Sequence, residues 1–459
     1  MSEHSESFIE KSTVKTADRD HRRKINFNIG RYNAVVPKGK EQFSNVNLVR
    51  EKAKNIKWKA IENLDKMLES FEAKITKRGA KVIWAEDAQQ ALDEIGKICA
   101  EKKCKTLVKS KSMVTEEIHL NKFLEEQGIE SIETDLGEYI QQLDGEPPYH
   151  IVTPAMHKSK EDVAKLFADK LGTDPKLTPE QLTQVARNVL RKKYAEAEVG
   201  ITGANFIIAD IGGIAITENE GNARLSCSIP KTHIVVASIE KVIPSMNDLA
   251  LFWPLLATYG TGQQITVYST IINGPKQEGE TNGPDEMYVI LLDNGRTNIL
   301  ANEKTRESLY CIRCGACLNA CPVYKNIGGH SYETTYSGPI GSVITPHLKE
   351  MKEWKHLSYA SSLCGNCTEV CAVKINLHEL LLENRHEAVD EGDTSFAERT
   401  AWKLWKKAML KRNLMNMGSR KIKNWVVNTL LKGWKEHRSK MEFPQKSFNQ
   451  MWKEKYGNR

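Results

Sequence analysis

Residues 311–324 read CIRCGACLNACPVY and place four cysteines in the pattern C-x2-C-x2-C-x3-C-P. Three thiolates at steps of three residues can surround one inorganic iron-sulfur cube from a single loop. The fourth cysteine comes one residue later and is followed by Pro322, so its side chain turns toward a second centre. Gly315 gives the loop backbone room beside the sulfides. This stretch predicts a region whose fold is organised around two inorganic clusters.

Residues 361–373 read SSLCGNCTEVCAV and hold a shorter version of the pattern, C-x2-C-x3-C. When the two stretches are aligned, these cysteines match the last three of the first stretch. Ser361 stands in place of the first cysteine, and Ala372 stands in place of the proline. Exchange of cysteines between the motifs, as in two-cluster ferredoxins, predicts two [4Fe-4S] clusters. The predicted ligands are Cys311, Cys314, Cys317 and Cys371 for the first cluster, and Cys321, Cys364 and Cys367 for the second.

The second predicted cluster lacks a fourth thiolate. Two states fit this pattern: a cubane whose fourth iron takes a hydroxyl, carboxylate, imidazole, water or a partner's group, or a [3Fe-4S] cluster that has lost that iron. By alignment, Ser361 is the first candidate for the missing ligand, and His356 and His330 are weaker candidates. The competing interpretation makes all three ordinary loop residues.

Zinc is the alternative metal for the seven cysteines. Structural zinc is usually held by two ligand pairs and has no use for the additional cysteines of this pattern, so the spacing favours iron and sulfide. The remaining Cys99, Cys104 and Cys227 are isolated, and we expect them to be buried core thiols. Clustered cysteines in a chain of 459 residues also indicate a reducing compartment.

Upstream of the cysteines, short apolar runs alternate with helical segments from Lys81 onward. This alternation predicts an α/β domain, with a mostly parallel sheet and helices on its faces. We expect four parts along the chain: an N-terminal arm over 1–50, the α/β domain over 51–300, a helical two-cluster ferredoxin-type domain over 301–393, and a basic helical region over 394–459.

Two stretches of the α/β domain are candidates for ligand contact. IGGIAITENEGN, residues 211–222, places paired glycines and then Glu218 and Glu220 at a strand end, although a turn with solvated acids is the alternative. VKSKSMVTEE, residues 108–117, puts lysines and serines before a helix start, where an anion could bind free amides, although N-capping explains the same pattern. GTGQQI, from Gly260, follows a predicted helix and lacks a third glycine, so it does not predict a dinucleotide site.

Positive charge is concentrated at the C-terminal end. The formal net charge is +7, but residues 394–459 contain 17 Lys or Arg against 4 Asp or Glu, so this region carries +13 and the remainder −6. The chain as a whole is therefore not expected to bind nucleic acid. In ERTAWKLWKKAMLKR, residues 398–412, apolar residues share one helical face opposite lysines. This pattern suits packing on the chain's own core, a partner's groove or an anionic membrane surface.

The most apolar short stretch, LALFWPLLATYG from Leu249, is too short to span a bilayer and contains Pro254. The N-terminal residues are polar and charged, without an apolar segment for secretion. We therefore expect a cytoplasmic protein, with peripheral contact at the inner face of the membrane as an option for the basic region.

The two α/β stretches, both cysteine motifs and the tryptophan-rich basic end together resemble the lactate utilisation protein B family, the iron-sulfur proteins of L-lactate utilisation, which carry a LUD domain. The resemblance covers nearly the whole chain. It implies an α/β domain akin to the coenzyme A transferase and sugar-phosphate isomerase superfamily, and two [4Fe-4S] clusters bound by the seven cysteines. It also implies two companion proteins and a role in carrying electrons from L-lactate as it is oxidised to pyruvate. Ala372 departs from the commoner ferredoxin pattern, which affects the local turn more than the ligation.

Iron-sulfur clusters accept one electron at a time and cannot take a hydride, and the sequence shows no motif for another redox group. We therefore expect a non-catalytic electron-transfer component, with a quinone at the membrane as a candidate acceptor. Two alternatives stay open: the α/β domain itself binds and oxidises a 2-hydroxy acid, or the cluster with three cysteines serves as a redox sensor.

Overall fold

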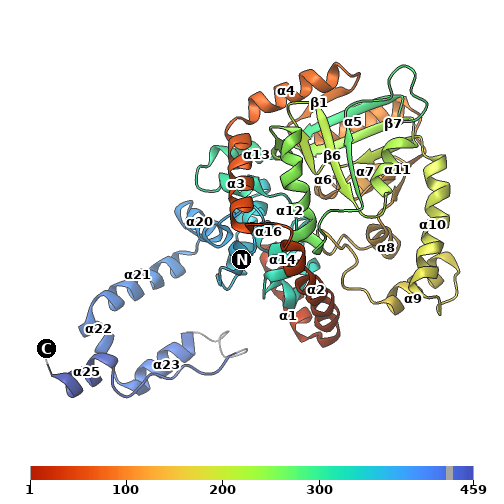
Figure 1. The fold of residues 1–459 in the computed structure, drawn as a ribbon. Helices are drawn as coiled ribbons and strands as arrows, with labels where there is room; N and C mark the ends of the chain where they lie inside the picture. Colours follow the sequence, from red (N-terminus) through yellow and green to blue (C-terminus); the bar gives the residue numbers. More distant parts are fainter. Residues whose placement is uncertain (1, 431–437, 458–459) are drawn as a thin grey trace. The chain divides into compact units, whose positions relative to one another are not determined.

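The computed structural model describes residues 2–430 and 438–457. Contacts divide the chain into a large unit that ends at Ala388 and a small unit that begins at Val389. Figure 1 shows the elements of both units in chain order.

Six strands of the large unit, two of which (β1 and β7) are labelled in Figure 1, form a parallel sheet in the order β1-β10-β7-β4-β2-β3. All seven residues of β7 are buried, as expected for a strand covered on both faces. The chain moves from β2 out to β3 and then returns to β4 on the other side of β2, so the winding reverses between β2 and β4. The strands are β1 (Lys81–Ala85), β2 (Thr106–Lys109), β3 (Glu130–Glu133), β4 (Val199–Thr202), β7 (Thr232–Ser238) and β10 (Glu286–Leu292).

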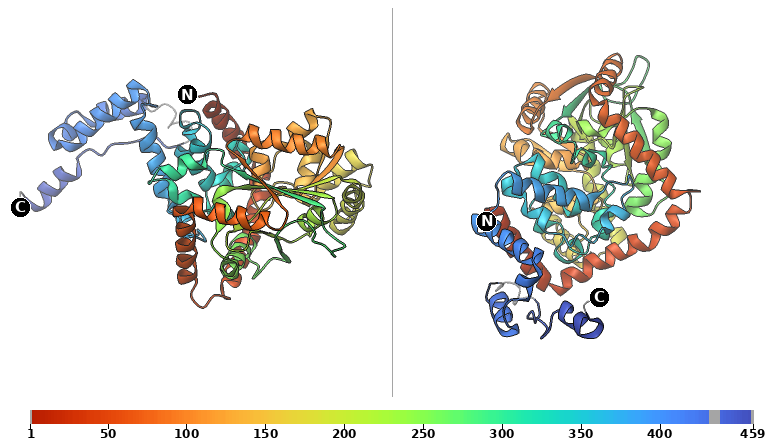
Figure 2. Two further views of the ribbon diagram at one scale, coloured as in Figure 1. Left: turned by 90° about the horizontal axis from the view of Figure 1, so that it is seen from above. Right: turned by 90° about the vertical axis from the view of Figure 1, so that its left-hand side faces the viewer.

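Helices cover both faces of this sheet, as the left view of Figure 2 shows. On one face, α5 and α7 bury Ile95 and Leu124 in the cluster that contains Ile234 of β7. On the other face, α4 buries Phe71 in the cluster that contains Val235. The helices of this region are α4 (Leu64–Thr76), α5 (Ala88–Glu101), α6 (Met113–Glu117), α7 (Leu120–Glu126), α8 (Leu136–Asp144), α9 (Lys160–Leu171) and α10 (Pro179–Glu196).

A second, four-stranded sheet has the order β8-β5-β6-β9. Its strands separate two cores, because alternate residues of a strand face opposite sides. Ile207 of β5 lies in the cluster of the large sheet, whereas Phe206 and Ile208 lie in the cluster that includes the cysteines. The elements here are β5 (Phe206–Ile208), β6 (Gly213–Glu218), α11 (Asn222–Ser228), the 3-10 turn η1 (Ile239–Lys241), β8 (Val242–Ile243), the 3-10 turn η2 (Met246–Asp248), α12 (Leu249–Thr261) and β9 (Tyr268–Ile272).

Three helices precede α4 at the N-terminal end of the described chain: α1 (Glu3–Ala17), α2 (Arg19–Lys40) and α3 (Val46–Glu62). The first two are strongly charged, but Ile25 and Ile29 of α2 are buried in the cluster that contains the cysteines. Arg50 of α3 donates hydrogen bonds from Nε to the Cys371 carbonyl at 2.9 Å and from Nη2 to the Glu369 carbonyl at 2.6 Å. The N-terminal helices therefore pack directly on the cysteine region.

The cysteine region consists of short helices around the largest apolar cluster of the large unit. Tyr324, Leu318 and Leu357 are fully buried there. The elements are α13 (Arg296–Ala301), η3 (Arg306–Tyr310), α14 (Ala316–Ala320), α15 (Tyr324–Ile327), η4 (His330–Tyr332), α16 (Gly338–Leu348), α17 (Met351–Trp354), α18 (His356–Tyr359), α19 (Asn366–Glu369) and α20 (Leu377–Asp390).

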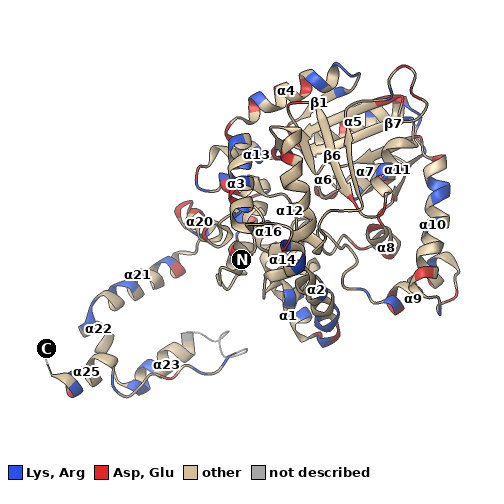
Figure 3. Cartoon of the chain, viewed as in Figure 1, with Lys and Arg blue, Asp and Glu red and all other residues tan. Residues whose placement is uncertain are grey.

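The small unit contains amphipathic helices with exposed apolar side chains. In α21, Trp402 is 60% exposed and Trp405 55%, and their rings contact edge to face at 5.5 Å. Lys and Arg residues, blue in Figure 3, recur along the described helices of this unit. None of the described helices is long and apolar enough to cross a membrane. The helices are α21 (Phe396–Leu410), α22 (Arg412–Asn416), α23 (Arg420–Leu430) and α25 (Phe448–Tyr456).

The predicted fold class is confirmed: an α/β region with a parallel sheet precedes a helical cysteine region and a helical basic region.

Candidate iron-sulfur centres and the adjoining pocket

The two cysteine motifs adopt the same local backbone. Gly315 and Gly365 follow equivalent cysteines, and each has φ of +77°. The residues before those cysteines, Arg313 and Leu363, also lie in the left-handed region, with φ of +60° and +52°. Each loop then enters a short helix, α14 or α19, whose backbone starts beside the loop's own cysteines. The repeat read from the sequence is therefore also a repeat in conformation.

The structure brings the cysteines together in two groups, each drawing on both motifs. In the buried group, Cys314 lies near Cys371 and Cys311, and burial together with these neighbouring thiols raises the pKa of Cys314 to about 12. Burial and the same neighbours raise the pKa of Cys317 above its usual range. The buried group is Cys311, Cys314, Cys317 and Cys371.

The second group lies nearer the surface. Burial, with Cys321 and Cys364 close by, raises the pKa of Cys367 to about 11, whereas Cys364 is exposed. The Asn366 side chain of α19 donates a hydrogen bond to the Ala320 carbonyl of α14 at 3.1 Å and holds the two loops together. The surface group is Cys321, Cys364 and Cys367.

The surroundings of the buried group suit a thiolate-bound cluster. A small cavity of about 20 Å³ is lined by the four cysteines of this group. Its other lining residues are Arg313, Gly315 and apolar side chains, and none of the described lining residues is a carboxylate. Backbone N–H groups point at sulfur: Arg313 to Cys311 at 3.4 Å and Ile375 to Cys371 at 3.3 Å. Such bonds stabilise a thiolate and tune a cluster held by it. Four convergent sulfurs in an apolar shell fit iron and sulfide.

The three candidates for a fourth ligand at the surface group all have other hydrogen bonds. Ser361 Oγ accepts from the Leu363 N–H at 3.1 Å. His356 Nδ1 contacts the Glu353 carbonyl at 3.1 Å, and its ring packs near Phe8 and Trp354. His330 Nε2 donates to the Pro147 carbonyl at 2.8 Å. These contacts engage Ser361 Oγ, His356 Nδ1 and His330 Nε2, whereas His356 Nε2 is buried without a partner among the described residues.

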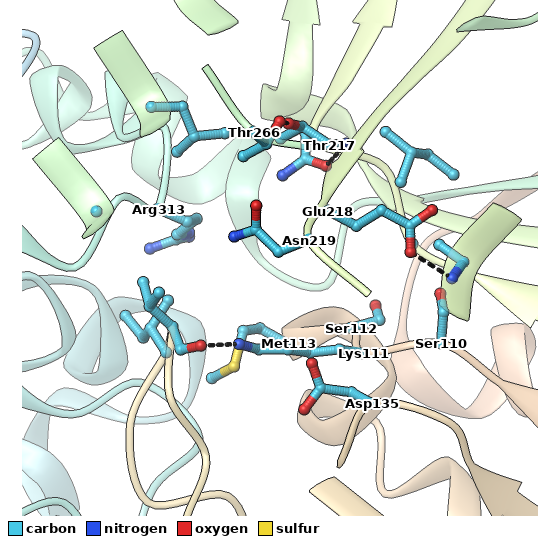
Figure 4. Close-up of a pocket in the computed structure, with 18 of the residues that line it drawn as sticks. Ser110, Lys111, Ser112, Met113, Asp135, Thr217, Glu218, Asn219, Thr266 and Arg313 are labelled. Carbon is cyan, nitrogen blue, oxygen red and sulfur yellow. Dashed lines mark hydrogen bonds between the residues drawn. The ribbon is translucent and has the colours of Figure 1, made fainter. Parts of the chain in front are cut away.

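A pocket of about 400 Å³ lies at the carboxyl ends of the parallel strands, where the winding reverses (Figure 4). Ligands of open α/β sheets bind at such reversals. Backbone approaches are close at its edges: a Cβ on Gly203 would lie 2.7 Å from Ser112 Oγ, and one on Gly260 would lie 3.3 Å from the Cys314 carbonyl. The pocket residues used below are Ser110, Lys111, Ser112, Asp135, Asn205, Glu218, Asn219, Glu220, Lys241, Arg313, Cys314 and Tyr336.

The pocket joins the α/β region to the buried cysteine group, because the Arg313–Cys314 loop forms part of its wall. Arg313 Nη2 lies 3.3 Å from Glu240 Oε1, just after β7, and the guanidinium stacks on the Tyr336 ring at 4.4 Å. Arg296 in turn lies 2.8 Å from Glu240 Oε2. Although burial opposes its ionisation, Glu240 beside these two guanidinium groups has a pKa lowered to about 2.

The acidic residues singled out in the sequence lie in the pocket wall. Glu218 accepts hydrogen bonds from the Ala223 and Arg224 amides at 2.7 and 2.8 Å, which fixes the start of α11. Glu220 accepts from the Leu136 amide at 3.0 Å, and burial with nearby Asp135 raises the pKa of Glu220 to about 7.

Of the basic stretch before α6, only part faces the pocket. Lys109 is fully buried and pairs with Glu133 at 2.7 Å and Glu116 at 3.0 Å, so it is not free to bind an anion. Ser112 caps α6 through the Thr115 amide. Lys111 lines the pocket and donates to the Val152 carbonyl at 2.6 Å.

Sequence reasoning missed the charged residues that join the two regions. Arg313 lies inside the first cysteine motif, and Glu240 and Lys241 directly follow an apolar run. A charged pair at the carboxyl end of a buried strand is a signal that could have identified the latter two.

Comparisons with known proteins agree with this architecture. A LUD domain matches residues 68–292, and a 4Fe-4S dicluster domain matches residues 307–375, which identifies the cysteine region as iron-sulfur binding. A solved structure of a duf162 family protein from Deinococcus radiodurans aligns with 50% of this chain and 98% of its own, with 14% identity and a TM-score of 0.30.

Lactate utilization protein B of Bacillus velezensis is 46% identical over 382 residues, covering 83% of this chain and 80% of its own. The protein of the same name from Anoxybacillus flavithermus is 44% identical over 423 residues and covers 89% of each chain. With an α/β region, two cysteine motifs and a similarity of this extent, the chain belongs to the lactate utilization protein B family.

Proposed function

We propose that the chain is the electron-transfer subunit of a multiprotein system that oxidises L-lactate to pyruvate, with two iron-sulfur clusters bound by the seven cysteines. The observation that supports this most is the connection between the two cysteine groups. Cys317 lies within α14 and Cys321 directly follows it, so one helical turn links a buried group beside a pocket to a group near the surface.

Iron-sulfur clusters supply one-electron transfer when bound, so two of them can take the two electrons of one lactate in succession. The chain's own residues keep the two cysteine groups close together and exclude water from the segment between them. Leu318 and Tyr324 are fully buried around α14, and Tyr332 packs near both Cys317 and Cys321. Arg50 places positive charge beside Cys371 of the buried group, which favours a more negative, reduced centre there.

The same proposal assigns partners to the two ends of the route. The relatives' name, lactate utilization protein B, suggests a system of several proteins, and we propose two companion proteins as electron donor and carrier. The exposed Cys364 marks the end at which a partner could exchange electrons. We propose that the protein acts in the cytoplasm and that its basic helices reach the inner face of the membrane near a quinone-linked acceptor.

The test is electron paramagnetic resonance of anaerobically purified protein with iron and sulfide analysis, followed by addition of L-lactate with and without the companion proteins. We expect signals from two clusters, reduced by lactate only when the companions are present. A colourless, zinc-containing protein would contradict the proposal. Reduction by lactate without companions would favour oxidation by the α/β domain itself. Oxygen-dependent binding to a target with unimpaired growth on lactate in a Cys364→Ser strain would favour a sensor.

A further inference from the structure

The pocket beside the buried cysteine group contains two positive charges without matching acceptors. Lys241 lines the pocket, and its ammonium has no hydrogen-bond or ion-pair partner in the part of the chain that the structure describes. Arg313 Nη1 is buried and likewise lacks an acceptor among the described residues, although Nη2 of the same group faces Glu240. Buried donors are nearly always satisfied in native proteins, so Arg313 Nη1 indicates a missing acceptor, and the partly buried ammonium of Lys241 in the same pocket is free to bind the same group.

The two cations also lie close enough to repel each other. Burial, and after it the charge of Arg313, lower the pKa of Lys241 to about 8. Glu240 offsets this repulsion only in part, because its two oxygens face Arg296 and Arg313. An anion between Lys241 and Arg313 would satisfy both donors, and Arg offers the planar geometry that a carboxylate matches.

The rest of the pocket presents a neutral amide and acidic side chains instead of positive charge. Asn205 accepts from the Thr217 amide through its side-chain oxygen at 2.8 Å, which leaves its NH₂ group available to an oxygen. The acidic side chains of Glu218 and Glu220 belong to the wall formed by residues 217–220, and both feel the charge of nearby Asp135. Figure 4 labels Glu218 and Asp135. A second carboxylate at that wall would be repelled, so the arrangement favours a ligand with one acidic end and one neutral polar end.

We infer that this pocket binds a small monocarboxylic acid with an oxygen on the neighbouring carbon, a 2-hydroxy or 2-oxo acid, with its carboxylate between Lys241 and Arg313. The choice of acid rests on the proposed function, and the inference concerns binding alone. A volume of about 400 Å³ exceeds the size of such an acid, which leaves room for waters that bridge it to the wall. The ligand would then lie against the loop that carries Cys314.

The first experiment is isothermal titration calorimetry on the anaerobically purified full chain with L-lactate, pyruvate, propionate and inorganic phosphate. We expect L-lactate and pyruvate to bind, and propionate and phosphate to bind at least about tenfold more weakly. Lys241→Met should weaken L-lactate binding at least about tenfold, because it removes one of two charge-assisted contacts. Lys276→Met is the matched control, since Lys276 pairs with Asp285 at 2.5 Å outside the pocket; it should leave binding unchanged.

The second experiment needs no variant and so does not depend on Lys241→Met retaining its fold. Wild-type protein is treated with an amine-modifying reagent, and modification of each lysine is followed by mass spectrometry. L-lactate should slow modification of Lys241 severalfold and leave that of Lys276 unchanged.

Three results would overturn the inference. The first is absence of binding by both L-lactate and pyruvate. The second is equal binding of phosphate, which would mean a site for any anion. The third is a Lys241→Met protein with unaltered L-lactate affinity but a lowered cluster potential, which would mean that Lys241 only balances the charge of the cluster. Because binding is measured without electron transfer, these results leave the proposed electron-transfer role to be judged by its own test.

Discussion

Arg313 of the first cysteine motif forms an ion pair at 3.3 Å with Glu240, which lies in the turn η1 directly after the central strand β7 of the large sheet. The Glu240 side chain is buried and that of Arg313 is 9% exposed, and Glu240 also binds Arg296 at 2.8 Å. Arg296 reaches Glu117 at 2.6 Å, and Tyr336 donates to the same Glu117 carboxylate at 2.6 Å. The α/β region and the cysteine region are therefore joined by a continuous buried charge network as well as by apolar packing.

Neutralising Glu240 should be costly. Glu240→Gln leaves Arg296 and Arg313 buried with one anion fewer, and we expect a loss of about 3 kcal/mol in the free energy of unfolding. Urea denaturation of the cluster-containing protein, followed by circular dichroism, measures this change. Glu278→Gln, at an exposed loop position, is the control and should cost less than about 0.5 kcal/mol. Equal stability of both variants would show that the network does not stabilise the junction.

The cysteines should differ sharply in their effect on iron content. We expect Cys321→Ser to lose the iron of the surface group and keep that of the buried group, because Cys321 gathers only with Cys364 and Cys367. Iron analysis and electron paramagnetic resonance should show one cluster signal in place of two. Cys227→Ser, which changes a buried thiol hydrogen-bonded to the Arg224 carbonyl, should retain all iron. Loss of both signals in Cys321→Ser would argue against separate ligand sets.

Stability should fall as the pH drops below about 6.5, in part through His233. This side chain is fully buried in β7 with Nε2 2.8 Å from Thr202 Oγ1, and burial lowers the pKa of His233 to about 3. In the unfolded state the pKa of this imidazole is near 6.5, so below that pH the unfolded state binds a proton that the folded state does not bind. The free energy of unfolding therefore decreases as the pH falls from about 6.5 to 3. At pH 5.5 the loss for one such group is about 1.4 kcal/mol.

His233→Gln should therefore show a smaller drop in melting temperature between pH 7.5 and 5.5 than the wild type. His386→Gln, which changes an exposed histidine of α20, should follow the wild-type curve. Parallel curves for all three proteins would mean that His233 is protonated equally in both states.

The basic helices can be tested for membrane contact. Trp402 and Trp405 are exposed beside lysines on α21, so Trp402→Ala/Trp405→Ala should reduce co-sedimentation with anionic vesicles at least about tenfold. The control is Trp58→Ala, which changes an exposed tryptophan of α3. If the wild-type protein does not bind anionic vesicles, or binds neutral vesicles equally well, the proposed contact of the basic helices with the membrane is wrong.

The sequence predicted those features that arise from short-range pattern. Cysteine spacing revealed the paired loops because three-residue steps impose a local backbone, and Gly315 and Gly365 repeat it. Alternating apolar runs revealed the α/β region. Strand order could not be predicted, since β1 pairs with β10 across some 200 intervening residues and no local pattern encodes that choice.

The pocket was predicted only in part for the same reason. Glu218 and Glu220 were singled out because glycines preceded them, but Arg313 and Lys241 come from stretches 72 residues apart whose meeting depends on the whole fold. At Lys109 the sequence pattern predicted more than the structure contains. Its neighbours suggested an anion site, but Lys109 forms an ion pair with Glu133 of the adjacent strand β3.

The single turn of α14 between Cys317 and Cys321 has a mechanical consequence. Each residue advances an α-helix by about 100° and 1.5 Å, so inserting or deleting one residue there would swing Cys321 to another side and dismantle the arrangement. The helical turn thus keeps the distance between the two proposed metal centres the same, because no hinge lies between Cys317 and Cys321. Regulation of electron flow would therefore have to act at the surfaces where an electron donor or acceptor binds, and not on the segment between the two cluster sites.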